Sequence, residues 1–251
     1  MRVDAIEGIP EVVPGNDLAQ VLIEAITAPG NGGLKPGDLL VIAQKVVSKA
    51  EGRYVRLAEV EPSDTALTLG QQTDKDPRIV ELILRESRQV LRHRTGLIVS
   101  ETHHGMVMAN AGIDQSNIRG EDGEVVLMLP LDSDQSAAAL RQRLEARFGS
   151  PIGVIISDSV GRAWRLGTTG QALGSSGPLA LWDLRGELDR EGRAMQSSQV
   201  GFIDQIASAG ALVMGEGAEG LPAARVRGLA WTPSNAGGRD LVRPAADDMF
   251  R

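Results

Sequence analysis

The sequence contains no cysteine, which excludes disulfide bonds, zinc sites with thiolate ligands and cysteine nucleophiles. The lack of cysteine fits a reducing cytoplasm, and we expect the protein to reside there. No apolar run approaches the roughly 18 residues that a membrane-spanning helix needs. Residues 1–7 lack the apolar core of a secretory signal, so we expect neither export nor membrane insertion.

Aromatic side chains make up only 3% of the 251 residues, so aliphatic side chains must supply the core. We expect Trp164, Trp182 and Trp231 to anchor core or loop packing rather than to form stacking platforms. Positive charge is in the minority, with a formal net charge of −7 and a pI of about 5.1. This balance argues against a nucleic-acid partner, because such a surface normally needs a basic face.

Strand-like and helix-like segments alternate along the chain, which predicts an α+β fold with mixed sheets and packed helices. We treat residues 1–251 as a single unit, and its length allows a two-lobed subunit. The predicted helices cover residues 16–26, 77–93, 134–148 and 198–209. The predicted strands cover residues 39–43, 97–99, 106–108, 125–129, 152–156, 211–214 and 223–231, and residues 232–251 are expected to form an extended cover or tail.

The most informative segment is the apolar run 152–156, which is followed directly by Ser157, Asp158 and Ser159. The run predicts a buried strand, and polar oxygens at its end would lie at a sheet edge where substrates often bind. A carboxylate beside a hydroxyl suits Mg²⁺ or Mn²⁺. The alternative is an aspartate that caps a tight turn. Arg162 and Arg165 follow, and both could meet anionic groups.

Two lysines follow the strand predicted at 39–43. If residues 44–50 are helical, Lys45 and Lys49 share one face and could hold a phosphate chain. Solvated surface lysines are the alternative. Residues 110–117 gather Asn, Asp and Ser side chains in a predicted turn, which could satisfy itself or could hold a metal and a sugar or base.

The glycine-rich segment 215–220 matches the dinucleotide fingerprint Gly-x-Gly-x-x-Gly by letter. No helix can follow at once, because Pro222 and a strand-like segment come next, so a Rossmann fold is not expected. The chain also has no Gly-x-x-x-x-Gly-Lys-Ser/Thr sequence, which excludes a P-loop. Segment 215–220 could bring its backbone close to phosphates while Glu216 holds a metal, or could simply connect two strands. Together these motifs indicate a metal-dependent enzyme that acts on a phosphate ester.

Read together, these segments resemble the coenzyme F-420-0:L-glutamate ligase family, also called the F-420-0 gamma-glutamyl ligases. The order and spacing of the matching motifs extend over most of the chain, which makes the set specific although each motif is weak alone. The motifs are residues 8–11, 37–53, 110–117, 157–165, 189–193 and 214–222.

The resemblance implies a GTP-dependent ligase that phosphorylates a carboxylate of F-420-0 and then joins L-glutamate to it as an amide. It also implies two divalent ions, Mg²⁺ or Mn²⁺, and K⁺ is a further candidate cofactor. Carried over by motif, Asp114 and Asp158 would bind the first metal, and Ser159 and Glu216 the second. Family members often carry threonine at the position of Ser159, which keeps the hydroxyl ligand.

By the same resemblance, several segments would contact GTP, with Glu11 and Gln44 acting through their main chains. We assign Arg162 to the catalytic site and, with Arg165, to an anionic substrate group. The resemblance further implies a butterfly-shaped homodimer. The residues that would bind GTP are Ile9, Pro10, Glu11, Val12, Gln44, Lys45, Lys49, Asn117, Met214, Gly215, Glu216, Gly217, Ala218, Glu219, Gly220 and Leu221.

Two other functions compete with this one. A metal-dependent kinase or nucleotidyltransferase would use the same metals but leave a phosphoryl or nucleotidyl group on its product. A non-catalytic GTP-binding module would signal to a partner instead. Three separated carboxylates, Asp114, Asp158 and Glu216, favour an enzyme, because nucleotide binding alone does not require them.

Overall fold

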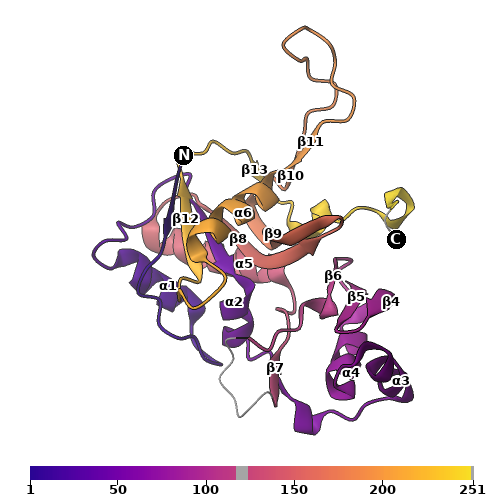
Figure 1. Ribbon diagram of the computed structural model, residues 1–251. Coiled ribbons are helices and arrows are strands. Elements are labelled where there is room, and N and C mark those ends of the chain that lie inside the picture. Colours follow the sequence, from indigo (N-terminus) through magenta and orange to yellow (C-terminus); the bar gives the residue numbers. More distant parts are fainter. Residues whose placement is uncertain (117–123, 250–251) are drawn as a thin grey trace.

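A six-stranded sheet forms the centre of the protein, with strand order β1-β12-β2-β8-β9-β13 (Figure 1). We describe it from a computed structural model in which residues 1–116 and 124–249 are described. Strands β2 and β8 are parallel, and the other neighbours are antiparallel. The strands are β1 (Arg2–Ala5), β2 (Leu39–Ala43), β8 (Gly153–Arg162), β9 (Arg165–Pro178), β12 (Ala223–Arg227) and β13 (Pro233–Ser234).

Helices cover both faces of this sheet. Helices α1 (Leu18–Thr27), α2 (Gln44–Ala50) and α5 (Ser133–Phe148) pack on one face, and α6 (Phe202–Met214) packs on the other. Successive side chains of β2 point to opposite faces, so the strand contributes to both cores. Burial on both faces explains why residues 39–43 read as an unbroken apolar run.

The segment between α2 and α5 builds a second group of elements beside the central sheet. Met108 packs against Val160 and Leu173 and so connects this group to β8 and β9. The elements are β3 (Tyr54–Arg56) paired with β7 (Val125–Leu127), helices α3 (Asp64–Thr73) and α4 (Pro77–Arg85), and the sheet β4 (Ser87–Arg94), β5 (Leu97–Thr102) and β6 (Val107–Ala109).

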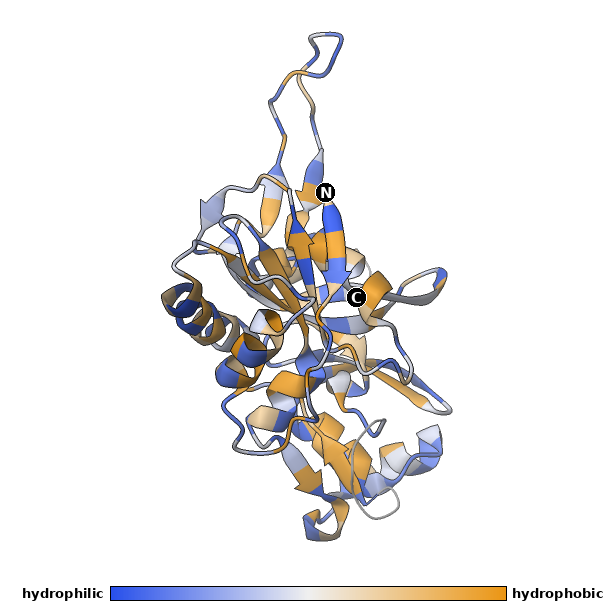
Figure 2. Ribbon diagram, turned by 90° about the vertical axis from the view of Figure 1, so that its left-hand side faces the viewer, coloured by the Kyte–Doolittle hydropathy of each residue, from blue (hydrophilic) through white to orange (hydrophobic). Residues whose placement is uncertain are grey.

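A narrow ribbon projects from the body of the molecule in both views (Figure 1, Figure 2). It begins with the antiparallel pair β10 (Leu181–Asp183) and β11 (Gln199–Gly201). Much of its backbone pairs with itself farther out, where Asp189 and Arg193 share a hydrogen bond. The ribbon is predominantly hydrophilic, with isolated apolar residues (Figure 2).

This architecture confirms the predicted α+β fold with mixed sheets, and it is neither a Rossmann nor a P-loop fold. Within the described residues, no helix combines the length and hydrophobicity needed to span a bilayer. The single-unit and two-lobed organisation and the butterfly-shaped homodimer stay predictions.

The helix predicted over residues 77–93 is wrong in its second half. Helix α4 ends at Arg85, and Ser87 starts strand β4, which pairs with β5 through two register shifts. The Ser87 hydroxyl donates to the Ile83 carbonyl at 2.6 Å and so satisfies an acceptor at the end of the helix. Pairing with β5 therefore overrides the helical spacing of the apolar residues after Arg85.

The strand predicted at residues 211–214 is also wrong, because these residues form the last turn of α6. Met214 is buried in line with Ile203, Ile206 and Gly210, while Leu212 is 86% exposed, which is the pattern of a helix with one covered face. In the β8 region the predicted strand is too short. Strand β8 continues to Arg162, so Asp158 and Ser159 lie within the strand and not in a turn.

The C-terminal segment does cover the central sheet, as predicted. Strand β13 pairs with β9, and Gly238 lies against the backbone of Leu173. Trp231 is a loop anchor, since its indole N–H donates to the Gly37 carbonyl at 2.9 Å. A place in the core is wrong for Trp164 and Trp182, which are 81% and 49% exposed.

Gly174 on β9 is a test of how closely α5 packs on the sheet. A Cβ at this position would overlap the backbone of Ser133 at the start of α5, and backbone cannot move aside as a flexible side chain can. We expect Gly174→Ala to lower the free energy of unfolding by about 3 kcal/mol. Gly161→Ala is the control, because a Cβ at Gly161 meets nothing within 4 Å. Equal chemical denaturation midpoints for the two variants would contradict this packing.

Candidate functional site

A cavity of about 920 Å³ lies where β2 and β8 meet the segment after α6 and the segment between β6 and β7. It brings together distant parts of the sequence, including most residues that the motifs predicted for a metal and nucleotide site. The lining comprises residues 9–12, 43–46, 49, 108–110, 112–114, 116, 157–161, 170, 211 and 214–222.

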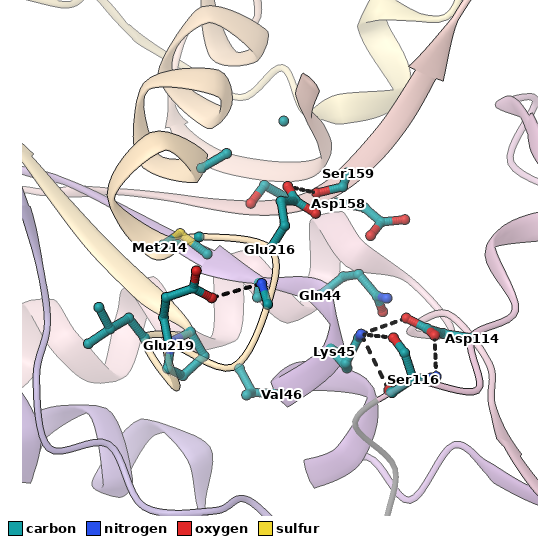
Figure 3. A pocket seen from close by; sticks show the side chains of 18 of the residues that line it. Gln44, Lys45, Val46, Asp114, Ser116, Asp158, Ser159, Met214, Glu216 and Glu219 are labelled. Atoms are coloured by element: carbon teal, nitrogen blue, oxygen red, sulfur yellow. Dashed lines mark hydrogen bonds and ion pairs between the residues drawn. The ribbon is translucent and has the colours of Figure 1, made fainter. Parts of the chain in front are cut away.

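Helix α2 places Lys45 and Lys49 at this cavity, which confirms the predicted helical turn. Parallel pairing of Ala43 with Ser157 sets the start of the helix beside Asp158. The Lys45 ammonium lies 2.6 Å from an Asp114 carboxylate oxygen and 3.0 Å from the Ser116 hydroxyl (Figure 3). These contacts connect α2 to the segment before β7.

Gln44 at the start of α2 is a residue whose side chain the sequence interpretation overlooked. It is buried, and the Ser48 hydroxyl donates to its amide oxygen at 2.9 Å. It also hydrogen-bonds to Asp158. The side chain of Gln44 therefore positions the floor of the cavity, whatever contact its main chain makes.

Asp158 lies on β8 at the floor of the cavity, where it is half-buried. Desolvation raises the pKa of its carboxyl to about 6, and the nearby charge of Asp114 adds to the rise. Hydrogen bonds from the Ser159 backbone and from Gln44, together with the charge of Lys45, limit the shift. Asp158 is therefore a carboxylate that is costly to ionise unless a cation comes close.

Asp114 reaches the cavity through a strained turn. Asn110 and Ala111 have φ values of 50° and 51°, in the left-handed region that side-chain-bearing residues rarely adopt. Burial would raise the pKa of Asp114, but the hydrogen bond and charge of Lys45 and the backbone N–H of Ser116, 2.6 Å away, outweigh it and lower the pKa. Asp114 and Asp158 thus share one cavity with opposite pKa shifts.

The loop after α6 supplies the other wall. Helix α6 ends at Met214, and the φ of 74° at Gly215 turns the chain toward the cavity. The Ser159 hydroxyl donates to the Glu216 carboxylate in a short hydrogen bond, and Glu219 accepts from the Gly217 N–H at 2.7 Å (Figure 3). This loop follows a helix and precedes strand β12, an order that rules out a dinucleotide-binding βαβ unit.

The oxygen atoms of this cavity suit a hard divalent cation. Asp114, Asp158, Ser159 and Glu216 all line it and offer carboxylate and hydroxyl oxygens. In the part of the chain that is described, no three His, Asp or Glu side chains gather closely enough to hold a metal ion without help. Mg²⁺ is an ion of this kind, and it commonly binds one or two protein carboxylates together with substrate phosphate oxygens.

Among the predicted site residues that the structure describes, Arg162 does not line the cavity. Arg162 lies past its edge at the end of β8, where its guanidinium donates to the Leu166 carbonyl at 3.0 Å. Asn117 lies outside the described residues. Gly170 and Ala211 were missed, because they contribute mainly backbone and a Cβ, which leave no chemical signature in a sequence.

Comparison with known proteins gives a consistent result. Residues 8–228 match the model of the family described as F420-0:Gamma-glutamyl ligase. The chain is 44% identical over 248 residues to the coenzyme F420:L-glutamate ligase of Methanothermobacter thermautotrophicus, covering 98% of this chain and 97% of that protein. It is 42% identical over 218 residues to the ligase of the same name from Methanocaldococcus jannaschii, covering 87% and 86%, and 38% identical over 257 residues to that of Haloarcula marismortui, covering 100% and 96%.

The raised pKa of Asp158 predicts that Asp158→Asn stabilises the metal-free protein near pH 7.5. Ionised Asp158 destabilises the folded state there, on the order of 2 kcal/mol, and asparagine carries no charge. The cost falls as pH drops through about 6, because the folded wild type then binds the proton, and it vanishes below 3.8. With a chelator present, we expect the melting temperature to rise by about 4–8 °C at pH 7.5 and much less at pH 4.

The control is Glu187→Gln, which removes an exposed carboxylate on the projecting ribbon. It should not change the melting temperature measurably at either pH. A lower melting temperature for Asp158→Asn at pH 7.5 would show that the Asp158 carboxylate is not desolvated.

Proposed function

The chain belongs to the F420-0:gamma-glutamyl ligase family, and from this membership we propose that it joins L-glutamate to F420-0 in a GTP-dependent reaction. One observation carries the proposal most directly. Carboxylates from three separate segments, Asp114, Asp158 and Glu216, line one cavity together with Lys45 and Lys49. That arrangement suits phosphoryl transfer, which needs positive charge around a nucleotide and oxygen ligands for cations.

The proposed reaction has two steps. In the first, a carboxylate oxygen of F420-0 attacks the γ-phosphorus of GTP, the bond between the γ-phosphorus and the bridging oxygen breaks, and GDP leaves. In the second, the amine of L-glutamate attacks the carbonyl carbon of the acyl phosphate, the C–O bond breaks, and phosphate leaves as the amine proton passes to solvent. Activation is needed because a free carboxylate is a poor electrophile, whereas phosphate is a good leaving group.

The side chains of α2 and the loop after α6 would hold the nucleotide. Lys45 and Lys49 present ammonium groups from one face of the helix, and the backbone of residues 215–220 can approach phosphate oxygens without interference from large side chains. Residues 9–12 line the same cavity and would complete the nucleotide contacts. Such contacts would hold the γ-phosphorus near β8, where Asp158 and Ser159 lie.

The oxygen donors form two groups that suit the two proposed metal ions. Asp114 and Asp158 would hold one ion, and Ser159 and Glu216, which already contact each other, would hold the second. Mg²⁺ or Mn²⁺ bound there would neutralise charge on the transferred phosphoryl group. The Lys45 ion pair keeps Asp114 ionised, and Gln44 orients Asp158.

We expect mass spectrometry of a reaction with F420-0, L-glutamate, GTP and Mn²⁺ to show a product heavier by one or more glutamyl residues. The same product should be absent without GTP. A phosphorylated or nucleotidylated acceptor would indicate the kinase or nucleotidyltransferase function instead. Bound but intact GTP, with metal-loaded protein and both co-substrates present, would favour the non-catalytic binding module.

Lys45→Met tests the role of α2. The substitution removes the positive charge of Lys45 from the proposed nucleotide site and takes away the ion-pair partner of Asp114. We therefore expect kcat/KM for GTP to fall on the order of 100-fold. Lys75→Met is the matched control, since Lys75 lies between α3 and α4 and does not line the cavity. Equal steady-state kinetics for the two variants would remove Lys45 from the site.

A further inference from the structure

The turn between β8 and β9 exposes two large apolar side chains next to two arginines. Arg162 pairs with Arg165 across the ribbon, and Ala163 and Trp164 form the turn between them. Trp164 is 81% exposed and Leu166 is 98% exposed. Exposed apolar groups of this size close to a substrate cavity are typical of ligand surfaces.

The backbone at Trp164 is strained. Its φ is 59°, in the left-handed region, where a bulky side chain is an outlier and glycine or asparagine is the usual residue. A mostly exposed tryptophan gains little packing energy to offset this cost. Core packing therefore does not explain why a tryptophan occupies this turn. A role in which its flat aromatic face contacts a ligand would explain it.

The turn lies on the same strand as the reacting centre. Asp158, Ser159 and Gly161 line the cavity, and Arg162 follows at once. Arg162 comes three positions after Ser159 on the strand, which corresponds to about 10 Å along it. Figure 1 shows the β8–β9 ribbon extending beyond α6, above the sheet of β4, β5 and β6 in that view.

Along the ribbon, the paired positions Arg162 and Arg165 come between the residues that line the cavity and Trp164. The Arg162 guanidinium is held by the Leu166 carbonyl, and its Nε is buried without a hydrogen-bond partner among the described residues. Arg165 is exposed on the facing strand. The order along the ribbon is therefore carboxylate and hydroxyl oxygens, then guanidinium groups, then an aromatic face.

We propose that Trp164 forms the subsite for the aromatic ring of the acceptor, which stacks on the indole while Arg162 and Arg165 face the acceptor's phosphodiester. This assignment rests on the proposed function, in which the acceptor is F420-0. F420-0 carries its planar deazaflavin at one end and its reacting carboxylate at the other, with the phosphodiester between them. That order matches the order of groups along the ribbon. Stacking on tryptophan makes Trp164 a specificity residue and not a catalytic residue.

The main variant is Trp164→Gly, because glycine removes the ring and relieves the strained φ at the same position. We expect its stability to equal or exceed that of the wild type, while the KM for F420-0 rises about 5- to 100-fold with little change in kcat. Trp164→Phe keeps an aromatic face and should lie within a few-fold of the wild type. Trp182→Gly, at the other exposed tryptophan, is the control and should leave KM unchanged.

A second acceptor separates ring recognition from general damage. An alkyl phosphodiester of lactate has the carboxylate and the phosphodiester but no ring, so the wild type and Trp164→Gly should use it equally poorly. Equal loss with both acceptors, or no loss with F420-0, would overturn the proposal. A change of oligomeric state in Trp164→Gly by size-exclusion chromatography would also overturn it, by assigning the turn to a contact between copies of the chain.

Binding without turnover distinguishes this proposal from the proposed function. The deazaflavin ring is fluorescent, so its anisotropy reports binding of F420-0 in the absence of GTP. If the wild type shows no ligase activity but binds the ring through Trp164, the ligase function fails and the subsite stands. If the wild type is an active ligase and Trp164→Gly binds the ring equally well, the subsite fails alone.

Discussion

The parallel pairing of β2 with β8 is the constraint on which the candidate site depends. Five residue pairs, from Leu39 opposite Gly153 to Ala43 opposite Ser157, align the ends of two strands that lie far apart in the sequence. Because the chain leaves β2 into a helix while β8 continues, Lys45 and Asp158 face one cavity. A shift of one residue would turn the side chains of β8 to the opposite faces and remove Asp158 from the cavity floor.

Sequence patterns predicted the parts of the fold in which burial is complete. Residues 39–43 and 152–156 are apolar on both faces, and such runs have few alternatives to a central strand. The wrong predictions fall where a short apolar run is compatible with both the helical and the strand periodicity. Residues 211–214 read as a strand alone, and only packing of α6 against the sheet makes them helical. The residues after Arg85 were predicted as helix but form a strand, because they pair with β5. The local spacing of apolar residues does not reveal that partner.

The sequence motifs predicted which residues form the site, but not how their side chains contact one another. Family resemblance selected Asp114, Asp158 and Glu216, and all three line one cavity. The pairing of Lys45 with Asp114, the side-chain role of Gln44 and the raised pKa of Asp158 arise from contacts between distant segments and from desolvation. The exposure of Trp164 was missed for a related reason, since tryptophan usually goes to the interior and the left-handed turn is invisible in the sequence.

The closeness of α6 to the sheet has a consequence for how related sequences can diverge. A Cβ at Gly170 would come within 2.6 Å of the Ala207 carbonyl, so the helix rests almost directly on the backbone of β9. The loop that begins at Gly215 follows directly from this helix. Its distance from Asp158 therefore depends on the absence of a side chain at Gly170 on the neighbouring strand. Drift toward larger residues at Gly170 would lift the helix and widen the cavity, so substrate range can change through positions that never meet a substrate.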